Sequence, residues 1–358
     1  MLELLNAAKM VGGEYHIHAT NLAFEKGTLN VLLGPTLSGK TSLMRLMAGL
    51  DRPTSGSVHF DGADVTGMPV QKRNVAMVYQ QFINYPALTV YENIASPMRI
   101  AGKNAATIDR EVRKAADLLR LTPYLDRTPL NLSGGQQQRT ALARALVKNA
   151  SLVLMDEPLA NLDYKLREEL RAELPKIFAQ SGAIFVYATT EPSEALLLGG
   201  NTATLSEGRV TQFGPTISVY RNPFDLVTAK TFADPPLNFI DVVKAGGVFQ
   251  KQDATMLPVP AHLAGMADGP VTIAFHPHHL GLSPQNPAAA RLQARTQISE
   301  ITGSESFVHL DFDGVRWVML AHGIHNIDPD TEVDVYLDTR HVMAFGTDGR
   351  AIATGAKA

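Results

Sequence analysis

Short apolar runs alternate with helix-like stretches over the first two-thirds of the chain. The runs LNVLL (29–33), LVLM (152–155) and IFVYA (184–188) have the length and continuous apolar character of strands buried in a parallel sheet. Between them, residues 107–121 carry apolar side chains at intervals of four, three and four, the spacing of one helix face. This alternation predicts an α/β domain with a mainly parallel sheet.

The pattern changes after about residue 235. Segment 232–241, FADPPLNFID, contains a proline pair and is predicted to be a linker. Short segments beyond it alternate apolar and polar residues, as in a small antiparallel barrel; they are VTIAF, ARTQISEI, FVHLDF, VRWVML, EVDVYL and HVMAF. We therefore expect two domains, residues 1–235 and an all-β barrel over residues 236–358, rather than one continuous domain. Trp317 is expected in the barrel core.

Composition narrows the function further. The chain is 45% hydrophobic and 19% charged with a net charge of −3, which does not suit a protein that coats nucleic acid or anionic lipid. The absence of cysteine excludes disulfides, thiolate metal sites and cysteine nucleophiles. No apolar stretch approaches the roughly 18–20 residues that span a bilayer. Any membrane role is therefore expected to need a partner.

Residues 34–41 read GPTLSGKT and match the pattern G-x-x-x-x-G-K-[ST] between an apolar run and an amphipathic stretch. Such a loop turns backbone N–H groups toward phosphate oxygens at the positive end of the following helix. Lys40 would reach the β- and γ-phosphates, and the Thr41 hydroxyl would bind Mg²⁺. A glycine-rich turn with a surface lysine is disfavoured by this context. The residues assigned to the nucleotide are Gly34, Pro35, Thr36, Leu37, Ser38, Gly39, Lys40, Thr41 and Ser42.

Two carboxylates follow the apolar run 152–155. Asp156, at the end of a buried strand beside a phosphate loop, is suited to holding Mg²⁺. Glu157 can polarise an attacking water as a general base. Alone, the pair could be an acidic helix cap, but the phosphate loop favours the functional interpretation.

Residues 132–139 read LSGGQQQR. Two glycines after a serine open a helical stretch, forming a second helix N-terminus suited to phosphate. Because the domain already has one phosphate loop, the second is expected to cover a nucleotide held by another subunit. An N-cap serine with two turn glycines would explain the helix start, but not the three glutamines 136–138.

Residues 1 to about 235 resemble the ATP-binding-cassette (ABC) ATPase family. The resemblance lies in five motifs that occur in the family's order: GPTLSGKT, VYQQ (78–81), LSGGQQQR, LVLMDEP and NLD (161–163). The C-terminal part of the chain resembles the OB-like regulatory barrel of carbohydrate and polyol importers, through the segments HPHHL, ISEITGSESFVHLDF and HVMAFGTDG. Within that group, the sequence is similar to ATPase subunits of importers of glycerol-like substrates at GPTLSGKT, GSVHFDG and NYPALTVYENI. The resemblance implies a P-loop NTPase fold with a helical subdomain at about 82–148, followed by the barrel. Within the barrel, His276, His278 and His279 are expected in a surface loop rather than a metal site.

Roles follow from the resemblance position by position. It implies that Thr41, Gln80 and Asp156 bind Mg²⁺, that Gln80 also senses the membrane subunit, and that Glu157 is the catalytic base. The resemblance further implies contacts that reach the second subunit, made by Ser133, Gly135, Gln136 and Asp163.

Three positions depart from the family. Thr190 stands where the family has a histidine that contacts the γ-phosphate. Val11 stands where the family has an aromatic residue that stacks on adenine, and Tyr15 is the residue that could replace this aromatic. Leu37 stands at a phosphate-loop position where the family has glycine. All three belong to the side that holds ATP, which favours a heterodimer with a better-equipped ATPase subunit. A homodimer served by Tyr15 and Thr190 stays open.

The resemblance implies an ATPase that uses ATP and Mg²⁺ to drive import of a carbohydrate or polyol, glycerol or a derivative among them. It implies two transmembrane permease subunits, a periplasmic or extracellular substrate-binding protein acting indirectly, and peripheral attachment to the cytoplasmic face of the inner membrane. Two alternatives stay open: an ATP-sensing subunit with little turnover, and a soluble ABC ATPase outside transport. No nucleic-acid partner is expected, because no tandem cassette, coiled-coil insertion or basic patch is visible.

Overall fold

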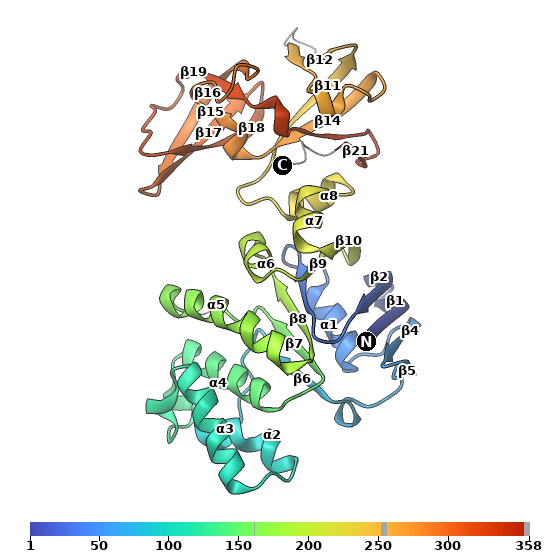
Figure 1. Cartoon of the computed structure of the whole chain (residues 1–358), viewed down its shortest axis with the longest axis vertical. Coiled ribbons are helices and arrows are strands. Elements are labelled where there is room, and N and C mark those ends of the chain that lie inside the picture. Colours follow the sequence, from blue (N-terminus) through green and yellow to red (C-terminus); the bar gives the residue numbers. More distant parts are fainter. Residues whose placement is uncertain (161, 252–255, 354–358) are drawn as a thin grey trace. The chain divides into compact units, whose positions relative to one another are not determined.

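The structure, a computed structural model, describes residues 1–160, 162–251 and 256–353. The chain divides into two compact units, Met1–Thr216 and Ile217–Ala358 (Figure 1). This division precedes the boundary predicted at residue 235, because helices α7 (Thr216–Arg221) and α8 (Leu226–Thr231) associate with the second unit. There the backbone N–H of Leu226 donates to the carbonyl oxygen of Gly349 at 2.9 Å.

The centre of the first unit is a six-stranded sheet with the order β10-β9-β3-β8-β7-β6. All neighbours pair in parallel except the edge strand β10, which is antiparallel to β9. The three apolar runs of the sequence are β3, β8 and β7, which confirms the predicted α/β fold. The strands are β10 (Arg209–Pro215), β9 (Asn201–Ser206), β3 (Leu29–Leu33), β8 (Ile184–Thr189), β7 (Leu152–Asp156) and β6 (Val75–Val78).

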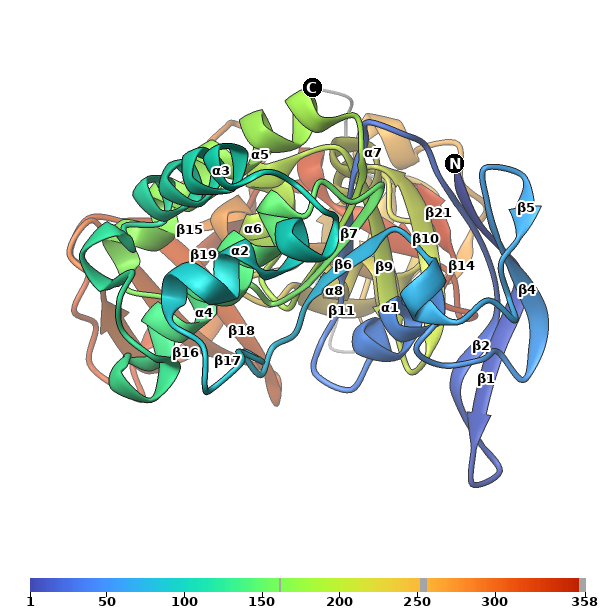
Figure 2. The same cartoon turned by 90° about the horizontal axis from the view of Figure 1, so that it is seen from below.

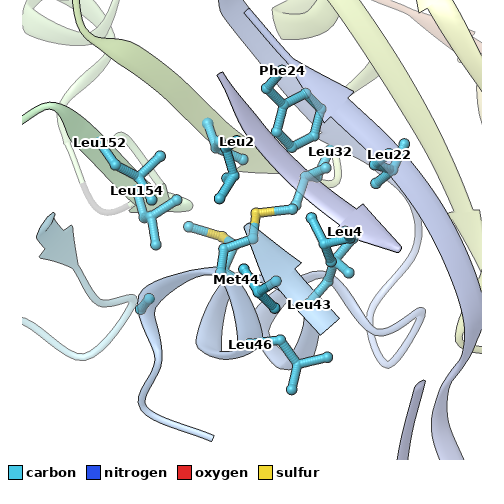
Figure 3. Packing of buried hydrophobic residues seen from close by; sticks show 14 of the residues in the cluster. Leu2, Leu4, Leu22, Phe24, Leu32, Leu43, Met44, Leu46, Leu152 and Leu154 are labelled. Carbon is cyan, nitrogen blue, oxygen red and sulfur yellow. The ribbon is translucent and has the colours of Figure 1, made fainter. Parts of the chain in front are cut away.

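A four-stranded antiparallel sheet with the order β2-β1-β4-β5 completes the α/β core. Its strands are β2 (Glu14–Phe24), β1 (Leu2–Val11), β4 (Ser55–Phe60) and β5 (Ala63–Asp64). Helix α1 (Lys40–Ala48) packs its apolar side chains against both sheets. Figure 3 shows Leu43 and Met44 of α1 among the leucines of β1 and β7. This packing fixes the start of α1 relative to the ends of the central strands.

The helical subdomain consists of α2 (Val90–Ile100), α3 (Ala105–Leu118) and α4 (Gly134–Val147). In both views these helices lie on the opposite side of the central sheet from β1, β2 and β4 (Figure 2). The helix predicted over residues 107–121 is α3, which starts earlier because the side chain of Asn104 accepts a hydrogen bond from the backbone N–H of Thr107 at 2.9 Å. Helices α5 (Tyr164–Ser181) and α6 (Pro192–Leu198) follow β7 and β8.

Beyond α8, the second unit consists of two antiparallel sheets around one core, as predicted for the barrel. Trp317 is fully buried there, stacks on Phe312 with ring centroids 4.1 Å apart, and donates its indole N–H to the carbonyl oxygen of Phe239 at 3.0 Å. The strands are β11 (Asn238–Ala245), β12 (Val248–Gln250), β13 (Met256–Pro258), β14 (Gly269–Phe275), β15 (Leu280–Gly281), β16 (Ala290–Ile301), β17 (Glu305–Phe312), β18 (Val315–His322), β19 (Glu332–Leu337), β20 (Met343–Phe345) and β21 (Ala351–Ala353).

The end of the predicted linker 232–241 is part of the barrel, because β11 starts at Asn238. The buried Asn238 amide exchanges two hydrogen bonds with the backbone of Val318, both at 2.8 Å, and so joins the two sheets. Over the described ranges 1–160, 162–251 and 256–353, no helix has both the length and the apolar character needed to cross a bilayer.

Candidate functional site

The phosphate loop connects the end of β3 at Leu33 to the start of α1 at Lys40. Its path requires two glycines. A Cβ on Gly34 would lie 2.4 Å from the carbonyl oxygen of Leu205, and Gly39 has a φ of 104° with Ile17 2.9 Å from the position of its missing Cβ. The loop therefore passes close to neighbouring backbone and leads directly into the N-terminus of a helix, which attracts anions.

Two polar groups of this loop suit a polyphosphate. The Lys40 ammonium donates to the carbonyl oxygens of Gly34 and Pro35 at 2.7 and 2.9 Å. Burial lowers the pKa of Lys40 below its usual value, against the opposing effect of the Glu157 and Asp156 carboxylates. Among the described residues, the buried Ser38 hydroxyl has no hydrogen-bond partner. A phosphate would give the lysine an anionic partner and the serine an acceptor.

Thr41 and Asp156 meet at the neighbouring position. The Thr41 hydroxyl donates to Oδ2 of Asp156 at 2.7 Å, and Asp156 is buried. Desolvation raises the pKa of Asp156 above its ordinary value, while the Thr41 hydrogen bond and Lys40 oppose the shift. A buried carboxylate beside a hydroxyl is a suitable oxygen pair for Mg²⁺, whose charge would offset the desolvation.

Glu157 and Gln80 form the next pair. The amide Nε2 of Gln80 donates to Oε2 of Glu157 at 2.9 Å. Burial raises the pKa of Glu157, Lys40 opposes that shift, and Asp156 adds to it. Since β6, β7 and β3 are parallel strands, their carboxyl ends bring Gln80, Asp156, Glu157 and the phosphate loop to one edge of the sheet. A carboxylate with a raised pKa at this edge is suited to accept a proton from water.

Thr190 follows the end of β8 and is exposed. The residue before it, Thr189, accepts the backbone N–H of Gly34 at 3.3 Å with its carbonyl oxygen, which places this segment beside the phosphate loop. The buried carboxylate of Glu194 holds the segment, accepting hydroxyl hydrogens from Thr189 at 2.6 Å and from Tyr187 at 3.1 Å. The sequence pattern did not single out Glu194, since one carboxylate in a helix carries no specific signal.

Val11 and Tyr15 lie at the exposed turn between β1 and β2, with 48% and 50% of their surfaces accessible. The Tyr15 ring stacks on the imidazole of His18 with centroids 4.6 Å apart. Strand β2 runs close to the phosphate loop, because the N–H of His18 donates to Gly208 and the N–H of Gly208 donates to Ser38, each at 2.9 Å. The sequence alone gave no signal for His18.

Leu37 is the most exposed of the large apolar residues described, with 93% of its surface accessible. Its φ of 67° lies in the left-handed region that glycine adopts without strain. A leucine here therefore combines an unfavourable backbone conformation with an apolar side chain in solvent.

Ser133 is the N-cap of α4, and its loop satisfies its own polar groups. The Ser133 hydroxyl accepts the N–H of Gln136 at 3.3 Å, and Oε1 of Gln136 accepts the N–H of Ser133 at 2.9 Å. Asp163 likewise caps α5, accepting the N–H of Leu166 at 3.0 Å. Asn161 of the same motif lies outside the described residues. Across the described ranges, no hydrogen bond or ion pair joins residues 132–136 to residues 34–41.

The chain is similar to known proteins along most of its length. The family model described as "ABC transporter" matches residues 17–160. The chain is 35% identical over 368 residues to the trehalose/maltose import ATP-binding protein MalK of Thermococcus litoralis, covering 98% of this chain and 99% of that protein. It is 36% identical over 325 residues to the sn-glycerol-3-phosphate import ATP-binding protein UgpC of Salmonella typhi, covering 90% and 91%.

A third relative, the alpha-glucoside transport ATP-binding protein AglK of Rhizobium meliloti, is 42% identical over 240 residues, or 67% of this chain and 66% of that protein. Among solved structures, the dimeric ATP-binding cassette MJ0796 in a post-hydrolysis state with ADP and Pi is 28% identical. It covers 60% of this chain and 99% of its own, with a TM-score of 0.56.

Proposed function

Because the chain belongs to the ABC transporter family, we propose that it is the ATP-hydrolysing subunit of an importer for a carbohydrate or polyol. The observation that carries this proposal is the meeting of Thr41, Gln80, Asp156 and Glu157 beside the phosphate loop. The relatives named above import trehalose or maltose, sn-glycerol-3-phosphate and alpha-glucosides. Glycerol or a glycerol derivative is one candidate substrate within that range.

In this proposal the groups of the site divide the binding and hydrolysis of ATP between them. The amides of residues 34–41 and the Lys40 ammonium bind the nucleotide phosphates. Thr41, Asp156 and Gln80 hold Mg²⁺, which neutralises charge on the phosphates when it is bound. The Glu157 carboxylate accepts a proton from the attacking water, and Gln80 orients that carboxylate.

The same proposal assigns the permease contact to the helical subdomain. A groove of about 320 Å³ is lined there by Tyr85, Leu88, Glu92, Ser96, Arg99 and Ile100. Ile100 is 85% exposed at one end of it, which favours an apolar partner. We assign this groove to a cytoplasmic segment of the permease, so that the chain sits peripherally at the inner face of the membrane. The second unit has a regulatory role in this scheme.

We further propose that the working dimer contains a different ATPase subunit. Three features of the chain's own ATP side support this: exposed Val11 where an aromatic is expected, strained Leu37, and Thr190 in place of histidine. The loop at Ser133, in contrast, forms a capping box with Gln136 at the start of α4. A homodimer would contain two weakened sites, whereas a heterodimer would contain one strong site covered by this chain's Ser133 loop.

Native purification of the complex tests the proposal. We expect two permease subunits and a second, distinct ATPase subunit to co-purify. In proteoliposomes with the external binding protein, radiolabelled glycerol, sn-glycerol-3-phosphate and maltose are then compared for ATP-dependent uptake. Recovery of the chain without membrane subunits, or uptake that continues without ATP, would contradict importer function.

A further inference from the structure

Gln138 connects the helix of the LSGGQ loop to the turn that carries Glu157. It lies in α4, two residues after Gln136, and only 1% of its surface is accessible. Its amide Nε2 donates to the carbonyl oxygen of Pro158 at 2.7 Å and to that of Glu157 at 3.3 Å. One side chain therefore bridges two elements that the proposed function assigns to different ATP sites.

The turn that Gln138 contacts is conformationally demanding. Glu157 has a φ of 46°, in the left-handed region that is unfavourable for a non-glycine residue. Such a conformation persists only where neighbouring groups hold it. Three sets of contacts do so. The N–H of Glu157 donates to the carbonyl oxygen of Ala188 at 3.0 Å, and the N–H of Ala160 donates to the carbonyl oxygen of Glu157 at 3.3 Å. The Gln138 amide donates to the carbonyl oxygens of Glu157 and Pro158.

A glutamine at this position is itself costly. Its Oε1 atom is buried and, within the part of the chain that the structure describes, accepts no hydrogen bond. An unpaired buried acceptor is destabilising, and an apolar side chain of the same length would avoid that cost. The two donor contacts are what glutamine provides and an apolar residue does not.

We propose that Gln138 is a positioning residue that holds Glu157 in its left-handed conformation and fastens that turn to helix α4. The first turn of α4 is the part that faces a nucleotide on the second subunit in the proposed dimer. When the dimer closes, a shift of α4 toward the nucleotide on the second subunit would therefore also move the Glu157 turn. The Gln138 side chain transmits this shift, because it is hydrogen-bonded to the turn. The consequence for catalysis rests on the proposed role of Glu157 as general base.

Hydrogen exchange on the assembled complex tests the structural part. Gln138→Met keeps the side-chain length and removes the donors. We expect the amides of Glu157, Leu159 and Ala160 to exchange about tenfold faster, as for the loss of about one net hydrogen bond. Gln137→Met is the matched control, since the neighbouring amide donates to Leu132 at 3.3 Å instead. Unchanged exchange in Gln138→Met, or equal acceleration in both variants, would overturn the proposal.

Vanadate trapping of labelled 8-azido-ATP tests the catalytic part, because label on this chain reports turnover at its own site. We expect Gln138→Met to lower trapping about tenfold while labelling on ice, which reports binding alone, changes less than about twofold. In a Glu157→Gln background, Gln138→Met should lower trapping no further, since both act through one group.

The outcomes separate the two proposals. If Glu157→Gln leaves trapping at the parental level, the base assignment fails, and the exchange measurement alone decides whether Gln138 holds the turn. If Glu157→Gln lowers trapping and Gln138→Met does not, the positioning role is overturned. Should Gln138→Met fail to melt cooperatively, Gln138→Leu, which is also uncharged and lacks the donors, replaces it in both measurements.

Discussion

The Thr41 hydroxyl lies 2.7 Å from Oδ2 of Asp156, although the two residues are 115 positions apart in the chain. Thr41 is held by the start of α1 and Asp156 by the end of β7, and both elements are fixed by the core of the first unit. The proposed metal-binding pair is therefore held together by the core of the first unit. Its buried carboxylate destabilises the nucleotide-free protein, because desolvation is the largest influence on its pKa.

Asp156→Asn should therefore stabilise the nucleotide-free chain while removing Mg²⁺-dependent ATP binding. A raised pKa means that the folded form binds the proton more tightly than the unfolded form, so stability falls as the pH rises above the ordinary value of 3.8. Asparagine has no such dependence. At pH 7 we expect the free energy of unfolding to rise on the order of 1 kcal/mol, with a shallower pH slope, by calorimetry. A less stable nucleotide-free variant would contradict this account.

Lys40→Ala should abolish tight ATP binding. The ammonium is held beside the loop by two carbonyl oxygens and is the cation nearest the expected phosphates. Isothermal titration should show about hundredfold weaker affinity or worse, close to 3 kcal/mol. Lys26→Ala removes an exposed lysine that pairs with Asp61 and should bind ATP like the parent. Equal affinity in the Lys40 variant would refute the assignment of residues 34–41.

Leu37→Gly should strengthen the chain's own ATP site. Glycine removes the strain of a φ of 67° and an apolar side chain that is 93% exposed. We expect the free energy of unfolding to rise by about 1 kcal/mol and ATP to bind more tightly. Leu37→Ala removes bulk but keeps most of the backbone strain, so it should give a smaller gain. Weaker binding in the glycine variant would show that the leucine contributes to the site.

Ser133→Arg and Glu157→Gln should separate the heterodimer from the homodimer. In the heterodimer, the Ser133 loop covers the strong site and Glu157 serves the weak one, so Ser133→Arg should lower total ATPase activity far more. In the homodimer every site uses both residues, and the two losses should be similar. Ordinary turnover by this chain alone, abolished by Glu157→Gln, would exclude the heterodimer.

The division between the units predicts where the chain can be shortened. A chain ending at Thr216 should melt cooperatively and bind ATP, because the site residues all precede that position. A chain ending at residue 235 retains α7 and α8 without the barrel residues they contact, such as His276 beside Tyr220. We expect the longer product to be less soluble. Failure of the 216-residue product to fold would contradict the independence of the first unit.

Features with a local signal were predictable from the sequence. The runs that became β3, β7 and β8 are continuous apolar segments, and the residues that follow them were predicted to form the site. Parallel pairing then brings those residues to one edge without further information from the sequence. The alternating segments of the barrel and the burial of Trp317 were equally readable.

Features that depend on tertiary contacts were not predictable. Asn238 follows a proline pair and reads as linker, yet its amide joins two sheets through Val318. The specific contacts of Gln138 are visible only once α4 lies beside the turn at Pro158. Positive φ at Glu157 has no sequence signal, because glutamate rarely adopts it.

The hydrogen bonds of Lys40 to Gly34 and Pro35 bear on the binding of ATP. These two carbonyl oxygens accept hydrogen bonds from the ammonium within the loop itself, so the lysine has polar partners without a nucleotide. If Lys40 binds the phosphates as proposed, entering ATP would have to displace these internal acceptors, which would lower its net affinity. The carbonyl oxygens of the loop would thus compete with ATP for the lysine.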